Sequence, residues 1–129
     1  MADTAREAAN RRLILAVYEQ VLGPLESSRV DELFAPGYIQ HSPLAATGAA
    51  GLKAFLDWAR AHSPHAKHHL KRLFTDGDHV IAHVHVVIHP GDRGNAVVDI
   101  FRIENGKVAE HWDVAQEIPA RSANEHGML

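Results

Sequence analysis

The segment from Val97 to Gln116 constrains the fold more than any other part of the chain. An Asn-Gly pair at positions 105 and 106 lies between two runs rich in β-branched and aromatic residues, a strong short-range signal for a β-hairpin. Strand interiors disfavour aspartate, yet Asp99 and Asp113 lie within these apolar runs, with His111 close to the second. A buried carboxylate must be paired, hydrogen-bonded or protonated, so each position is costly unless the protein uses it. This hairpin is therefore where we expect chemistry.

The register of the hairpin decides which of these groups meet. With a two-residue type I′ turn, Asp99 faces Trp112, and Asp113 lies on the opposite side of the sheet from Asp99. With a three-residue loop and Gly106 in a left-handed bulge position, Asp99 faces His111. We favour the second register because it gathers the titratable groups on one face, predicted to be a pocket wall: Val97, Asp99, Phe101, Ala109, His111, Asp113 and Ala115. The other face is then a packing or subunit surface: Val98, Ile100, Arg102, Val108, Glu110, Trp112, Val114 and Gln116.

The rest of the chain predicts helices first and strands second. Helical periodicity and stop signals indicate three helices before Pro64, and alternating apolar residues after it indicate strands. Helices followed by a long antiparallel sheet are typical of an α+β fold, and no linker or repeat divides the chain, so we expect one domain over residues 1–129. The helices are expected at about residues 4–22, 28–34 and 48–62, and the two strands before the hairpin at 68–75 and 80–89.

Composition excludes several classes of function. The net charge of −3 and the pI near 6.4 give no basic stripe for nucleic acid. The chain has no cysteine, no apolar run long enough for a membrane span or signal peptide, and no glycine-rich phosphate loop. We therefore expect a cytoplasmic protein that binds a small molecule, without a cofactor, nucleic acid or membrane.

Five segments, in this order and spacing, resemble one protein family. They are YIQHSP (Tyr38–Pro43), Gly51 with the Phe55 helix, DGDHVIAHVHV (Asp76–Val86), VDIFRIENGKVAEHWDVAQ (Val98–Gln116) and SANEHGML (Ser122–Leu129). Together they resemble the SnoaL-like polyketide cyclases of the nuclear transport factor 2-like superfamily. The resemblance implies a cone-shaped α+β barrel, with three N-terminal helices packed on a curved antiparallel sheet around a pocket.

The resemblance also implies a role for the last strand. In the polyketide cyclases, an aspartate on this strand is the acid/base of an aldol closure, and Asp113 matches its position. A histidine one strand earlier in those enzymes corresponds here to Asp99, so their substrate contacts do not carry over. His111 across the hairpin can restore an Asp-His pair. Polyketide ring formation is consequently less expected than the family name suggests.

We therefore predict a cofactor-independent lyase or isomerase acting on a small to medium apolar carbonyl compound. Asp113 is expected to be the base, because an apolar cavity raises the proton affinity of a carboxylate. His111 is expected to be the proton donor or relay, and Asp99 to fix its ring. One alternative is a non-catalytic ligand-binding or dimerisation module, in which Asp99 and His111 merely satisfy a buried sheet. Another is an epoxide hydrolase, for which Arg102 is the one nearby arginine, although it points away from Asp99.

Further substrate contacts are expected around the pocket. Just after the second helix, a phenol and an imidazole at the cavity mouth can hydrogen-bond a carbonyl oxygen. Aromatic residues of the third helix are also candidates, although such residues more often belong to a core. The predicted substrate-binding residues are Tyr38, Gln40, His41, Phe55, Trp58, His83 and Phe101.

His83 is chosen from a histidine-rich strand. Val80, Ala82, Val84, Val86 and Ile88 form its core face, and Ile81, His83, His85, Val87 and His89 the other. Three histidines spaced two residues apart along a strand spread over about 13 Å, too far for one metal ion without another strand, so no metal site is expected. His62, His65, His68 and His69 are expected to be mostly exposed.

A homodimer through the sheet is also expected. The hairpin face with Val98, Ile100, Trp112 and Val114 is too apolar to remain in contact with water. The aperiodic tail from Pro119 to Leu129 is the alternative cover for this face.

Overall fold

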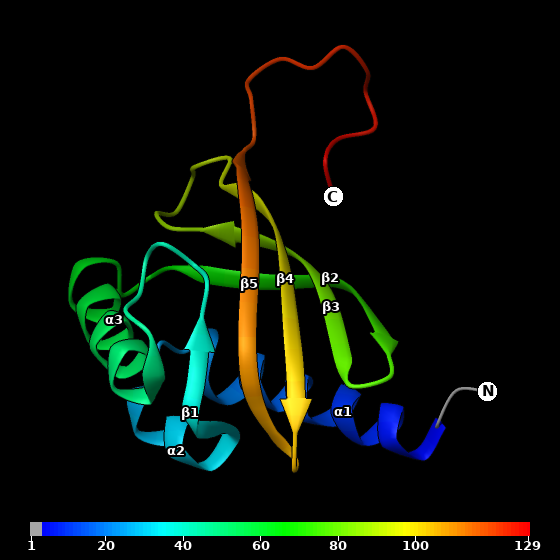
Figure 1. The fold of residues 1–129 in the computed structure, drawn as a ribbon. Coiled ribbons are helices and arrows are strands. Elements are labelled where there is room, and N and C mark those ends of the chain that lie inside the picture. Colours follow the sequence, from blue (N-terminus) through cyan, green and yellow to red (C-terminus); the bar gives the residue numbers. More distant parts are fainter. Residues whose placement is uncertain (1–3) are drawn as a thin grey trace.

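The computed structural model describes residues 4–129 and shows helices packed on one side of a single curved sheet (Figure 1). The first helix continues into a π-helical turn, and the second is a short 3₁₀ and α pair. The helical elements are α1 (Thr4–Val17), η1 (Tyr18–Leu22), η2 (Ser27–Arg29), α2 (Val30–Leu33) and α3 (Gly48–His62). None of the helices in this described part is long and apolar enough to cross a membrane.

The sheet has five strands in the order β1-β5-β4-β3-β2. They are β1 (Phe34–Gln40), β2 (Lys67–Asp76), β3 (His79–Val87), β4 (Asn95–Glu104) and β5 (Lys107–Glu117). Strands β2 to β5 pair antiparallel, as predicted, but β1 pairs parallel with β5. The sheet is therefore mixed and open at its edges, although the predicted α+β cone architecture is confirmed.

The second helix is shorter than predicted. It ends at Leu33, and Phe34 begins β1 instead of closing the helix. Pro36 disfavours a helical conformation for Ala35, so the helix must stop before it, and the chain is already extended at Phe34, one residue earlier than the apolar pattern suggests. Phe34 is buried in the core all the same.

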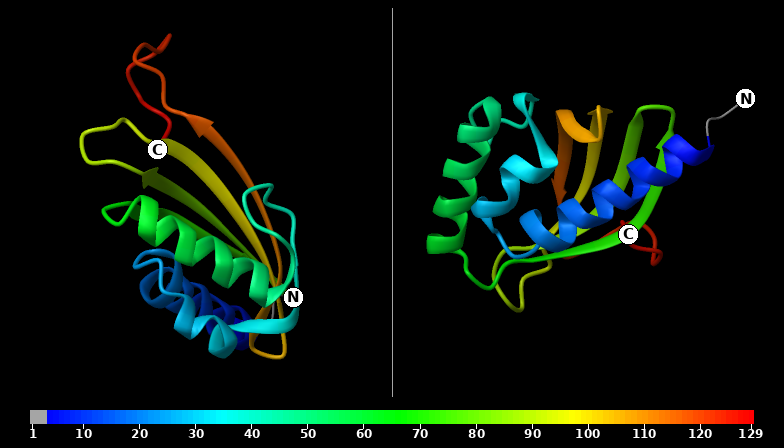
Figure 2. Two further views of the ribbon diagram at one scale, coloured as in Figure 1. Left: turned by 90° about the vertical axis from the view of Figure 1, so that its left-hand side faces the viewer. Right: turned by 90° about the horizontal axis from the view of Figure 1, so that it is seen from below.

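The core lies between the helices and the concave face of the sheet (Figure 2). Ile14, Val17 and Val21 form one buried stripe on α1 and η1, because residues three and four apart share a helix face. Leu56 of α3 and Val84 of β3 are fully buried against the same core. The helices thus cover the concave face of the curved sheet and pack against it.

The β4-β5 hairpin has the two-residue turn of the first alternative, so the favoured three-residue loop is wrong, and beyond the turn the pairing differs from both alternatives. Glu104 pairs with Lys107, so the turn has two residues, Asn105 and Gly106, both with positive φ. A bulge at Ala109 then shifts the pairing by one residue, and Asp99 faces Asp113 rather than His111 or Trp112. Since one extra residue turns the strand over, the titratable groups still share a face, while Val108, before the bulge, is buried.

The outer face of the hairpin is open in the single chain. Val98 is 38% exposed and Val114 is 73% exposed. The tail after β5 is mostly exposed and extends away from the sheet (Figure 1). The tail therefore does not cover this face, and the homodimer stays a prediction.

We predict that the hairpin turn tolerates no side chain at Gly106. Its φ of 74° lies in the left-handed region, so Gly106→Ala should lower the free energy of unfolding by about 1 kcal/mol. Gly37→Ala is the matched control, because nothing lies within 4 Å of the added Cβ and its φ is not left-handed. Urea denaturation of both variants measures the difference. Equal stability of the two variants would contradict the turn assignment.

Candidate active site

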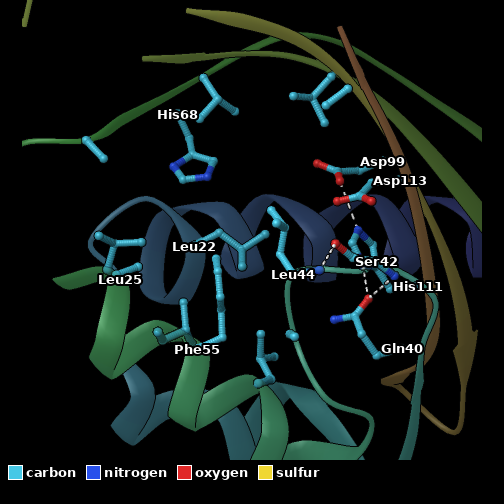
Figure 3. A pocket seen from close by; sticks show the side chains of 18 of the residues that line it. Leu22, Leu25, Gln40, Ser42, Leu44, Phe55, His68, Asp99, His111 and Asp113 are labelled. Carbon is cyan, nitrogen blue, oxygen red and sulfur yellow. Dashed lines mark hydrogen bonds and ion pairs between the residues drawn. The ribbon is translucent and has the colours of Figure 1, made fainter. Parts of the chain in front are cut away.

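A cavity of about 470 Å³ lies between α3, the β1-α3 loop and the concave face of the sheet. Its volume is within the usual range for small-molecule sites. Most of its wall is apolar, and its polar groups gather mainly at one end (Figure 3). The apolar lining includes Leu22, Leu25, Phe34, Leu44, Leu52, Phe55, Leu56, Val86, Ile88, Val97 and Phe101.

Three titratable residues of the hairpin meet at the polar end. Asp99 comes from β4, and His111 and Asp113 come from β5. One ligand-capable atom from each lies within 4.8 Å of the others, and all three residues line the cavity. The structure thus brings together the three predicted catalytic residues, although through a register that we did not predict.

The Asp99 carboxylate is buried and held on both oxygens. The Tyr18 hydroxyl donates to Oδ2 at 2.5 Å, and His111 Nε2 lies 2.9 Å from Oδ1. Burial and the neighbouring Asp99 charge together raise the pKa of Tyr18 well above its usual value, so the phenol keeps its proton. Asp99 is therefore fixed in place by contacts from η1 and β5, one to each oxygen.

The second ring nitrogen of His111 has a defined role. Its Nδ1 lies 2.8 Å from Gln40 Oε1, and the backbone N–H of Ser42 donates to the same oxygen at 3.0 Å. Because a backbone N–H can only donate, Gln40 Oε1 must accept, and His111 Nδ1 must carry a proton. The Gln40 amide in turn donates to the Tyr38 hydroxyl at 2.7 Å. This chain of hydrogen bonds fixes the His111 ring with Nε2 toward Asp99.

Asp113 is held less tightly than Asp99. It is half-buried and faces the cavity beside Asp99 (Figure 3). Burial raises the pKa of its carboxyl, His111 opposes this rise, Asp99 adds to it, and a hydrogen bond from Ser42 opposes it. A partly desolvated carboxylate with raised proton affinity is suited to taking a proton from a bound ligand.

The same three residues are close enough to share a cation. Both oxygens of Asp99 and both ring nitrogens of His111, however, already have protein partners. A metal ion bound by all three residues would displace the contact between His111 and Asp99. The arrangement therefore fits proton transfer better than it fits a metal site.

Five of the predicted substrate-binding residues line the cavity. Tyr38 is buried with its ring edge-on to Phe34, and Trp58 lies at the rim, 58% exposed. Contact with a ligand stays a prediction for each of them. The five residues are Tyr38, Gln40, Phe55, Trp58 and Phe101.

His41 and His83, also predicted to contact the substrate, are not among the residues that line the cavity. His41 follows Gln40, whose side chain faces inward, so alternation turns His41 to the outer face. There it lies 2.7 Å from Glu110 and stacks on Trp112 with ring centroids 5.0 Å apart. His83 also faces outward, where it contacts Arg72, because its neighbours in β3 fill the core face.

Sequence reasoning missed three residues of the cavity region: Tyr18, Ser42 and His68. Tyr18 lies one residue after Val17 and three before Val21 on the buried stripe of the first helix. His68 was expected to be exposed, but it shares the inward face of β2 with Leu70, two residues on. Both positions were visible in the spacing of their apolar neighbours.

His68 carries an unsatisfied polar atom. Among residues 4–129, its Nδ1 is the one buried side-chain nitrogen or oxygen without a hydrogen-bond partner. Burial lowers the pKa of its imidazole; Asp99 opposes this change and His69 adds to it. The ring is therefore neutral at pH 7.

We predict that Tyr18→Phe destabilises the protein more than Tyr38→Phe does. The first variant removes a donor from a buried carboxylate, which typically lowers the free energy of unfolding by about 1.5–3 kcal/mol. The second removes a neutral bond to Gln40, worth about 1 kcal/mol. Chemical denaturation at pH 7 measures both losses. An equal or reversed order would contradict the hydrogen bond that Tyr18 donates to the buried Asp99 carboxyl group.

We predict that His68→Leu stabilises the protein, increasingly so at low pH. Removing an unsatisfied buried polar atom should raise the free energy of unfolding by on the order of 1 kcal/mol at pH 7. In the unfolded chain His68 has its ordinary pKa of about 6.5, whereas in the folded chain its pKa is lower. The unfolded chain therefore binds the proton more readily, and the stability of the wild type falls as the pH drops below about 6.5. His68→Leu has no titrating group at this position, so it does not lose stability in this way at low pH. Thermal melts from pH 7.5 to 5 test the prediction, which a constant or narrowing gap contradicts.

Solved structures provide neighbours for the fold. IdmH, a candidate polyketide cyclase from Streptomyces antibioticus, has a TM-score of 0.68 at 16% identity, covering 82% of this chain and 91% of that one. A candidate isomerase of the SnoaL-like family from Agrobacterium tumefaciens has a TM-score of 0.68 at 16% identity, covering 87% and 98%. AclR, a candidate hydroxylase from Streptomyces galilaeus, has a TM-score of 0.70 at 19% identity, covering 86% and 81%.

These identities are low enough that the neighbours show the fold alone. A comparison with curated proteins finds no match. The family, in contrast, is shown directly by the sequence, because the family model described as the SnoaL-like domain matches residues 15–111. The chain therefore belongs to the SnoaL-like domain family, with the fold that the sequence motifs suggested.

Proposed function

We propose that the protein is a cofactor-independent lyase or isomerase that removes a proton next to a carbonyl group. The observation that carries this proposal is the contrast between two neighbouring carboxylates. Asp99 is fixed by Tyr18 and His111, whereas Asp113 faces the cavity with a pKa raised by burial. Two acids whose environments differ in this way are typical of acid/base sites.

The residues divide the chemistry as follows. Asp113 takes a proton from the carbon next to the carbonyl, and the electrons of the broken C–H bond move to the carbonyl oxygen to form an enolate. His111 is held between Asp99 and Gln40, so its Nε2 must exchange Asp99 for the substrate oxygen before it can donate a proton to the enolate. The enolate then either recovers the proton from Asp113 at another carbon, as in an isomerisation, or attacks a second carbonyl carbon, as in an aldol closure. In the second case a C–C bond forms, the electrons of that carbonyl move to its oxygen, and the oxygen takes the proton from Asp113.

The shape of the cavity supports an apolar substrate of small to medium size. Its wall is mainly aliphatic and aromatic, and its acid/base groups lie at one end. Structural neighbours described as candidate cyclases and a candidate isomerase support carbonyl chemistry on this scaffold.

We predict that Asp113→Asn lowers proton-transfer activity by about 10²- to 10⁴-fold, the usual contribution of a general base. Exchange of the α-protons of decan-2-one in D₂O, followed by NMR, measures this activity without knowledge of the natural substrate. In the wild type, the rate should fall as the pH drops through the raised pKa of Asp113, because only the ionised carboxylate accepts a proton. Asp76→Asn, at an exposed position at the end of β2, is the matched control.

Two outcomes of this experiment contradict the proposal. One is equal exchange in Asp113→Asn and the wild type. The other is activity that EDTA abolishes and a divalent cation restores, which would assign Asp99, His111 and Asp113 to a metal site instead.

The alternative of a non-catalytic binding module is favoured by one observation. Asp99, His111 and Gln40 satisfy one another within the protein, as expected of a structural network. For a binding module, decan-2-one would bind to the wild type and to Asp113→Asn with similar affinity and without proton exchange in either.

The epoxide hydrolase alternative has little support. Arg102 lies on the outer face, where it forms ion pairs with Glu104 and Glu110. The cavity lining, within the described residues, includes no arginine to act beside Asp99 and Asp113.

A homodimer through the outer face of the sheet remains part of the proposal. Val98 and Val114 expose apolar surface there, and Trp112 stacks on His41 beside them. Such a surface is commonly covered by a partner.

A further inference from the structure

We propose that His68 is a specificity-determining residue that binds a second polar group of the ligand, at the end of the cavity away from Asp113. The ligand would then be an elongated apolar compound with a carbonyl at one end and a hydroxyl or similar group at the other. The inference rests on the proposed function in placing the reacting carbonyl beside Asp113. The binding of the second group is independent of catalysis.

The cavity has polar groups on two opposite sides. His68 of β2 and the acids of β4 and β5 lie on opposite sides of the cavity (Figure 3). Leu22 and Leu44 border the space between them (Figure 3). A ligand that touches both ends therefore needs an apolar middle and a polar atom at each end.

The unsatisfied nitrogen of His68 indicates that a ligand supplies its missing hydrogen-bond partner. Nearly all buried polar atoms in proteins have a partner, because leaving one unpaired is costly. His68 Nδ1 is buried without one, whereas the nitrogens of His111 at the other end both have partners. His68 pairs with Val86 across the β2-β3 ladder, and both side chains line the cavity. An apolar residue at position 68 would line the cavity without the free-energy cost of an unpaired buried nitrogen.

The chemistry of the imidazole defines the group that it would bind. In its apolar surroundings the ring stays neutral, so its nitrogens offer one donor and one acceptor rather than a positive charge. A hydroxyl can both donate and accept, and it therefore fits Nδ1 in either tautomer. A carboxylate or phosphate is less suitable, because Asp99 and Asp113 line the same cavity.

Two matched probes test the inference. Decan-2-one carries a carbonyl alone, and 10-hydroxydecan-2-one adds a hydroxyl at the far end of a chain flexible enough to adapt to the cavity length. Calorimetric titration gives the affinity ratio of the two ketones for the wild type, His68→Leu and His68→Asn. Asn places a polar atom the same number of bonds from the backbone as His Nδ1, so it serves as the conservative variant.

We expect the ratio to shift against the hydroxyketone by about tenfold in His68→Leu, the size of one lost hydrogen bond in a buried site. The affinity for decan-2-one should stay the same, which also shows that the variant is folded. His68→Asn should recover part of the preference. An unchanged ratio in His68→Leu, or no binding of either ketone to the wild type, would overturn the inference.

The result is separable from that of the proposed function. Asp113→Asn should lose proton exchange but keep the wild-type ratio of the two affinities, because His68 is unchanged in that variant. If Asp113→Asn exchanges protons normally while His68→Leu shifts the ratio, the catalytic proposal fails and the recognition proposal stands. If Asp113→Asn loses proton exchange while His68→Leu leaves the affinity ratio unchanged, the catalytic proposal stands and the role of His68 in recognition is rejected.

Discussion

The buried carboxylate of Asp99 is the constraint on which the site depends. A carboxyl group away from water needs hydrogen-bond partners on both oxygens, and here they come from Tyr18 of η1 and His111 of the neighbouring strand. This requirement ties the helical layer to the sheet at one point. It also fixes His111, whose other nitrogen is held by Gln40 from β1. Two elements thus contact the carboxylate directly and β1 contacts it through His111, while Asp113 beside it is left facing the cavity.

Two local irregularities make this convergence possible. The π-helical turn begins at Tyr18, and such turns are frequent at functional sites. The bulge at Ala109 turns β5 over, so that the strand buries Val108 before the bulge and presents His111 and Asp113 to the cavity after it. A regular strand with the same two-residue turn would place Asp113 on the side opposite Asp99.

The polarity of the cavity is uneven, and this bears on recognition. Titratable groups are concentrated at the hairpin, where Asp99, His111 and Asp113 lie close together. The remaining wall is largely apolar, with the neutral imidazole of His68 as an unpartnered group within it. An apolar wall sets the size of a ligand, whereas isolated polar atoms set its orientation, and the cavity has both.

The sequence by itself determined the α+β class, the family, the position of the hairpin and the identity of the three titratable residues that meet at the polar end. Periodicity, Asn-Gly chemistry and aspartates within apolar strands are local properties, and local properties are readable from the chain. It could not determine the pairing of Asp99 with Asp113, the outward direction of His41 and His83, or the parts taken by Tyr18 and His68. Only the tertiary structure decided these, because one bulge reverses the faces of a strand and because a side chain's partners come from segments far away in sequence.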